Sequence, residues 1–170
     1  MAVDAFLSLI SKGTPVVGES HDATFGKSAF EIKDFSFGVE NPTSIGSATG
    51  GAGAGKAKFN EFTIKKTTDK ASAVLFQHLA QGVHYEKAVL SLRKAGGGEA
   101  SGKVFLTFNF GTVFTTKVDW SGPGDEGPEE SVTFVYGSLV VKYQPQQADG
   151  TLGAQTVGSW NQVTNSQNVS

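Results

Sequence analysis

The chain has 170 residues, of which 38% are hydrophobic and 18% are charged. This composition supplies enough apolar side chains for one packed core and excludes a disordered chain. The formal net charge of -2 argues against nucleic acid as the main partner, because phosphate binding requires a basic surface. Cysteine is absent, which excludes disulfides, thiolate metal sites and cysteine nucleophiles. We therefore expect one domain over residues 1–170.

Apolar and polar side chains alternate every two residues along most of the chain, which is the pattern of a half-buried β-strand. In chain order the pattern covers residues 5–10, 30–39, 62–65, 90–93, 104–110 and 132–143. Its phase changes at Lys33-Asp34, which predicts a bulge there. Gly137-Ser138 interrupts the last segment and fits either a tight hairpin or another bulge. We predict a mainly β fold, a compact barrel or sandwich of two β-sheets.

Residues 35–38 read Phe-Ser-Phe-Gly. In a strand, successive side chains point to opposite faces, so Phe35 and Phe37 share one face and Ser36 lies on the other. The motif predicts two rings directed into the core and a serine hydroxyl on the opposite surface.

Asn41–Gly55 is polar and glycine-rich and lacks the periodicity of a core element. Gly50–Ala57 (GGAGAGKA) nearly matches the phosphate-binding loop G-x-x-x-x-G-K-[ST]. However, Ala57 replaces the hydroxyl that would reach magnesium, and a strand pattern follows where a helix N-terminus would hold phosphate. We favour a protruding loop over residues 41–56 and keep a nucleotide enzyme built on residues 50–57 as a weaker hypothesis.

One segment has helical periodicity. Ala71, Leu75 and His78 fall on one stripe, with Asp69 placed to cap the first turn and Gly82 to end the last. We predict a single flanking helix over about residues 69–81. Further on, residues 121–130 read as a turn cluster with an acidic end, and residues 144–170 form a C-terminal segment anchored by Trp160.

No constellation of side chains indicates an active site. The histidines, His21, His78 and His84, lack metal-ligand spacing, and no G-x-S-x-G elbow occurs. We expect no catalytic residue, metal or cofactor. The basic pairs Lys65-Lys66 and Arg93-Lys94 lie at predicted strand ends. Their side chains are either exposed to solvent or in contact with the acidic residues of 125–130 across a subunit contact.

The N-terminal 15 residues lack a basic region, and the apolar run Ala5–Ile10 is too short for the core of a signal peptide. No segment approaches the ~20 apolar residues of a membrane span. We expect no membrane insertion, and any export would need a route without a cleaved signal peptide.

Seven stretches along the chain together resemble the hemolysin-coregulated protein (Hcp) family, the tube subunits of bacterial type VI secretion. They are MAVDAF (1–6), Gly18-Glu19-Ser20, FSFG (35–38), GAGAGK (51–56), DKAS (69–72), RKAGG (93–97) and YQPQ-x-ADG (143–150), followed by Trp-Asn at 160–161. Their order and spacing run over nearly the whole chain.

The resemblance implies a barrel-like pair of sheets with one flanking helix. It also implies a homohexameric ring that stacks into a tube, wrapped by a contractile sheath and tipped by a spike protein. Such a subunit has no enzymatic activity, carries effector proteins in its lumen, and passes from the bacterial cytoplasm to the exterior or a target cell.

The resemblance also assigns residues. It implies that Ser36 faces the lumen and contacts cargo. It places contacts between stacked rings in the glycine-rich loop, with these candidates: Asn41, Ser44, Ser47, Gly51, Gly53, Gly55 and Lys56. The alternative from another class is a small-ligand- or carbohydrate-binding β-sandwich.

Overall fold

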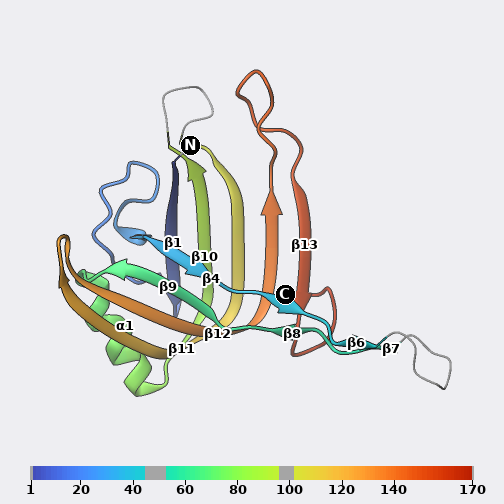
Figure 1. The fold of residues 1–170 in the computed structure, drawn as a ribbon, viewed down its shortest axis with the longest axis horizontal. Coiled ribbons are helices and arrows are strands. Elements are labelled where there is room, and N and C mark those ends of the chain that lie inside the picture. The colour runs from blue at the N-terminus through green and yellow to red at the C-terminus, as the bar shows by residue number, and fades with distance from the viewer. Residues whose placement is uncertain (1, 45–52, 96–101, 170) are drawn as a thin grey trace.

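The computed structural model describes residues 2–44, 53–95 and 102–169 of the chain. Its strands are β1 (Val3–Ser11), β2 (Thr14–Pro15), β3 (Phe30–Ile32), β4 (Asp34–Ser36), β5 (Val39–Glu40), β6 (Thr43–Ser44), β7 (Gly53–Ala54), β8 (Lys58–Phe59), β9 (Phe62–Thr67), β10 (His84–Lys94), β11 (Val104–Gly124), β12 (Gly127–Tyr143) and β13 (Thr156–Asn161). One α-helix, α1 (Lys70–Gln81), and a short 3-10 turn (Gly26–Ser28) complete the described elements. The predicted mainly β class with one flanking helix is confirmed (Figure 1).

Nine strands form one antiparallel sheet in the order β2-β1-β10-β11-β12-β9-β4, with β3 added to β1 and β13 added to β12. The long strand β12 changes partner along its length. Its first half, residues 129–134, pairs with β9, and its second half, residues 138–143, pairs with β13. The two layers anticipated from the sequence are therefore two parts of one sheet, joined by the long strands β11 and β12.

Residues 30–36 connect the two ends of this sheet. Strand β3 pairs with β1, whereas β4 pairs with β9. Between them the main-chain N–H of Lys33 donates to the carbonyl of Lys65 at 2.7 Å. The bulge predicted at Lys33-Asp34 is instead a break between β3 and β4, where the chain passes from one layer to the other.

The core lies between the layers and is dominated by aromatic rings. Phe62 stacks on Phe110 with ring centroids 4.4 Å apart, and the Phe134 ring lies 5.6 Å from Phe62. All three side chains are fully buried, as are Leu7 and Leu9 on β1. Burial of such side chains is the main favourable term for folding this chain.

Helix α1 begins and ends at the residues that the sequence indicated. The Asp69 carboxylate accepts the main-chain N–H of Ala71 at 3.0 Å, and the Ser72 hydroxyl accepts the N–H of Asp69 at 2.9 Å, completing a capping box. Gly82 adopts the left-handed conformation (φ 67°) that ends the last turn. Ala71 and Leu75 are buried on the face toward the sheet.

Gly137-Ser138 forms neither of the structures that the sequence left open. Strand β12 runs through it, with Tyr136 paired to Val113 and Ser138 paired to Gly111 in unbroken register. Gly137 does not have the positive φ angle of a turn glycine, and a Cβ atom there would lie at van der Waals distance, 3.4 Å, from Val163.

A narrow arm leaves the sheet after β4. Strand β5 pairs with β8, and β6 pairs with β7, so the two sides of the predicted loop 41–56 meet as an antiparallel ribbon. Figure 1 shows this ribbon extending away from the strands of the main sheet. In the described part of the chain, no helix is long and apolar enough to cross a membrane.

Candidate functional site

The Phe-Ser-Phe motif divides its side chains between two surfaces. Phe37 makes an edge contact with Phe108 at 4.9 Å and another with Phe110 at 5.3 Å between ring centroids. Phe35 contacts Phe108 at 6.2 Å. Both half-buried rings pack against the core, whereas Ser36 is exposed. The division of faces predicted from the sequence is confirmed.

Ser36 belongs to a surface built from several strands. It pairs with Thr63 of β9, and Thr63 pairs with Thr133 of β12. Side chains of directly paired residues lie on the same face of a sheet. The sequence offered no sign of this neighbourhood, because the three residues are far apart along the chain.

The structure places the arm residues away from Ser36. Ser44 pairs with Gly53, and the main-chain N–H of Gly55 donates to the Pro42 carbonyl at 3.1 Å. Asn41 and Lys56 are exposed. Ser47 and Gly51, two further candidates for contacts between stacked rings, lie outside the described residues.

The nucleotide hypothesis fails on local structure. Strands β8 and β9 follow Lys56, and α1 begins only at Lys70. A phosphate-binding loop requires a helix N-terminus directly after its lysine, where backbone N–H groups gather around the phosphate. Residues 50–57 therefore lack the element that would hold a nucleotide.

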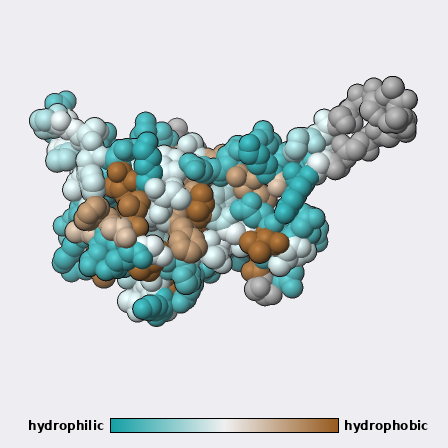
Figure 2. Space-filling model, turned by 90° about the horizontal axis from the view of Figure 1, so that it is seen from below, coloured by the Kyte–Doolittle hydropathy of each residue, from teal (hydrophilic) through white to brown (hydrophobic). Residues whose placement is uncertain are grey.

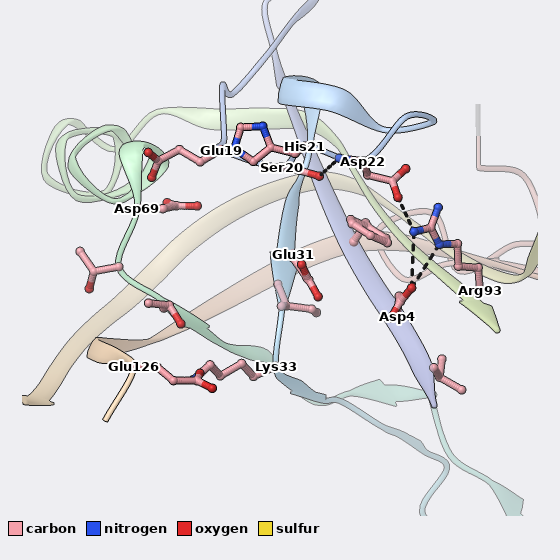
Figure 3. Close-up of a pocket in the computed structure, with 15 residues that line it drawn as sticks. Asp4, Glu19, Ser20, His21, Asp22, Glu31, Lys33, Asp69, Arg93 and Glu126 are labelled. Atoms are coloured by element: carbon pink, nitrogen blue, oxygen red, sulfur yellow. Dashed lines mark hydrogen bonds and ion pairs between the residues drawn. The ribbon is translucent and has the colours of Figure 1, made fainter. Parts of the chain in front are cut away.

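A polar hollow of about 980 Å³ lies between β1, β3, the start of α1 and the 19–22 segment (Figure 3). On one wall, Arg93 forms ion pairs with Asp22 and with Asp4, the latter at 3.4 Å. The hydrogen bond from Arg93 lowers the pKa of Asp22 below its ordinary value, although partial desolvation opposes the shift. On another side, the Lys33 ammonium lies 2.5 Å from Glu126 and 2.7 Å from Glu129.

A buried ion network lies beneath the hollow. Lys66 is fully buried, with its ammonium 2.6 Å from Asp69 and 2.7 Å from Glu130. Glu130 also accepts the Ser72 hydroxyl at 2.8 Å and the Trp120 indole N–H at 2.9 Å. Every charge in the network thus has a partner.

These contacts correct one sequence hypothesis. Within the chain, Lys66 pairs with Glu130 and Arg93 pairs with Asp4 and Asp22, so neither basic pair is simply a solvated strand end. The stretch 121–130, predicted as a turn cluster, is mostly strand, because β11 continues to Gly124 and β12 begins at Gly127. Acidic side chains of this hairpin meet Lys33 and Lys66 of their own subunit.

The histidines do not converge. His21 is exposed at the hollow, the His78 Nδ1 lies 3.0 Å from the Tyr85 hydroxyl, and the His84 ring lies 5.6 Å from Phe114. Burial raises the pKa of Tyr85 to about 12. Among the described residues, no group of three or more His, Cys, Asp or Glu side chains is placed to hold a metal ion.

Several large apolar side chains of the described residues are exposed, and two groups of apolar side chains bear on association. Phe76 and Trp120, each about half exposed, lie with ring centroids 6.0 Å apart near α1. A shallow groove of about 230 Å³ lies near the base of the arm, between β5, β8, β12 and β13, and is lined by Val39, Phe59, Val141 and Trp160. Figure 2 shows separate apolar patches on one face within a largely hydrophilic surface.

Comparison with known proteins gives a consistent result. The family model described as "Type VI secretion system effector, Hcp" matches residues 6–143. The chain is 33% identical over 107 residues to the protein hcp1 of Pseudomonas aeruginosa. That match covers 62% of this chain and 65% of the relative, slightly less than two thirds of its length.

Solved structures have the same fold. One reported as a type six secretion system protein matches with a TM-score of 0.87 and 28% identity, covering 98% of this chain and 100% of the other. The crystal structure of Hcp1 from Salmonella typhimurium matches with a TM-score of 0.74 and 24% identity, covering 99% and 100% of the two chains. With a family model that spans most of its length, this chain belongs to the Hcp family of type VI secretion proteins.

Proposed function

We propose that this chain is a structural subunit that assembles into hexameric rings, and that the rings stack into the inner tube of a type VI secretion apparatus. The family match over residues 6–143 carries this proposal. The protein would act in the bacterial cytoplasm and then leave the cell as part of the expelled tube, without a cleaved signal peptide. Its partners would be the spike and sheath proteins, and effector proteins held in the lumen.

The distribution of exposed apolar side chains supports a ring. A closed ring of identical subunits requires two different complementary surfaces on each subunit. The Phe76–Trp120 pair lies beside α1, and the Val39–Phe59 groove lies near the arm. Figure 1 shows α1 on one side of the main sheet and β8, at the base of the arm, on the other, so the two surfaces are separate, as head-to-tail association requires.

The arm supports contact between rings. A ribbon of only two short strand pairs is not stable by itself in water, so a neighbouring copy is a natural place for it to dock. We assign this role to the segment that holds Asn41, Gly55 and Lys56, together with the residues between them.

The position of Ser36 on the sheet supports a role in binding cargo. The Phe35 and Phe37 rings fix the strand to the core, so the Ser36 hydroxyl is presented from a rigid sheet. A hydroxyl both donates and accepts hydrogen bonds, which suits weak contacts with varied protein surfaces.

The mass of the assembly tests the proposal. Light scattering of the purified chain is expected to give six times 17.8 kDa, about 107 kDa, and negative-stain images are expected to show rings. A mass between one and two chains, without rings at any protein concentration, would contradict it. That result would favour the small-ligand- or carbohydrate-binding β-sandwich.

A further inference from the structure

Three hydroxyl side chains form a row across the surface that carries Ser36. Ser36 of β4 pairs directly with Thr63 of β9, which pairs directly with Thr133 of β12. In Figure 1, these three strands lie next to one another in the lower layer. The rows on either side of this one on the same strands, Phe35–Ile64–Val132 and Phe62–Phe134, point to the core.

The exposure of the three hydroxyls decreases along the row. Ser36 is exposed, Thr63 is half-buried, and Thr133 is only 8% exposed. The Thr63 and Thr133 hydroxyl oxygens lie 3.2 Å apart, so one donates to the other. Because Thr133 is buried, a bound molecule contacts Ser36 and Thr63, while Thr133 fixes the direction of the Thr63 hydroxyl.

The next row on this face is charged but balanced. It runs Asp34, Lys65, Ser131 and Asp119 across β4, β9, β12 and β11. Asp119 is itself paired with Lys117 at 3.1 Å. Lys117 itself pairs with Thr133, so two acidic and two basic side chains lie in or beside this side of the row, and they favour neither sign of charge. On the other side of the row, the same face carries the directly paired Val135 and Phe114, which are 37% and 39% exposed. The hydroxyls themselves suit uncharged polar groups, such as main-chain amides and amide or hydroxyl side chains.

We propose that Thr63 is a second cargo-contacting residue beside Ser36, that Thr133 is its positioning residue, and that the row binds uncharged polar groups on an effector protein. This inference rests on the proposed function, because it takes the surface around Ser36 to be the cargo surface.

The experiment measures retention of a tagged type VI effector that co-purifies with the parent ring. Thr63→Val removes the hydroxyl and keeps the shape of the side chain. It is expected to weaken the effector Kd about two- to tenfold, the value of one lost hydrogen bond. Thr63→Ser is expected to restore binding. Thr156→Val, the same change at an exposed position on β13, is the matched control and is expected to have no effect.

The role of Thr133 is tested by a double-mutant cycle. Thr133→Val is expected to weaken binding in the parent but to add nothing in the Thr63→Val background, because the hydroxyl that it positions is then absent. Additive effects, or an effect of Thr133→Val that matches a loss of melting temperature, would overturn the positioning role.

The outcomes separate this inference from the proposed function. If the parent forms no ring, or the ring retains no effector, the proposed function fails together with the inference. If the ring retains the effector and Ser36→Gln weakens that retention, but Thr63→Val leaves it unchanged, only the hydroxyl row is wrong. If Thr156→Val reduced effector retention as much as Thr63→Val does, the cargo-contacting role of the hydroxyl row would also be wrong.

Discussion

Removal of the Lys66 charge is expected to destabilise the fold strongly. Its ammonium is fully buried between Asp69 and Glu130. Lys66→Met leaves the buried Glu130 carboxylate without its cation, which costs about 3–5 kcal/mol of the free energy of unfolding. Lys65→Met, at the exposed neighbouring position, is the control and is expected to change stability by less than about 0.5 kcal/mol. Urea denaturation measures both, and equal losses would contradict the buried network.

Asp22 is expected to make stability depend on pH. Its pKa in the folded chain is lowered chiefly by the hydrogen bond from Arg93. The stabilisation is therefore fully present above the ordinary aspartate pKa and is lost as pH falls through the lowered value. Asp22→Asn should be less stable than the parent at pH 7, and the difference should shrink below about pH 4. Thermal melting from pH 7 to pH 2 measures it, and a difference independent of pH would show that the ion pair contributes nothing.

Substitution of Phe35 is expected to reduce the stability of the fold, whereas substitution of Ser36 is expected to reduce effector retention. Phe35→Ala removes a ring from the edge of the core and should cost about 3 kcal/mol. Ser36→Glu changes only an exposed position, so it should leave melting and ring mass unchanged while reducing effector retention strongly. Loss of the ring in Ser36→Glu, with an intact Phe35→Ala, would mean that the two faces of β4 are assigned the wrong way round.

At the scale of elements, α1 is held by its caps and by one buried face. Val74 lies half-buried in the second turn. Val74→Pro removes a main-chain hydrogen bond and clashes with the preceding turn, at a cost of about 3 kcal/mol or more. Val74→Ala keeps the backbone and is expected to cost clearly less. If the two variants unfolded at the same urea concentration, the helix would not contribute to stability as an intact element.

At the scale of the whole molecule, the arm and the sheet are expected to be separable. Strands β6 and β7 are the outermost described part of the arm. Replacing residues 45–52 by Asn-Gly, a pair suited to a two-residue hairpin turn, should keep this ladder. The variant should form rings of the parental mass but fewer stacked tubes in electron micrographs. A monomeric variant would mean that the arm makes contacts within a ring. If the rings stacked as the parent rings do, the arm would not contribute to the contact between rings.

The sequence by itself determined the local features of this protein. Alternation predicted the central parts of the main strands but missed β13 and the hairpin within 121–130. Asp69 and Gly82 predicted the ends of α1, and the Phe-Ser-Phe spacing predicted that Ser36 and its two neighbouring rings lie on opposite faces. Each of these depends on residues a few positions apart, where backbone geometry alone fixes which side chains share a face.

Only the tertiary structure decided which distant residues meet. Thr63 and Thr133 are 70 positions apart, and Lys66 and Glu130 are 64 apart, so neither contact leaves a periodic signal in the sequence. Both depend on the register between β9 and β12, where a shift of one residue would exchange the core and surface faces of a strand. That register brings Lys66 to its buried partner and places Thr63 beside Ser36.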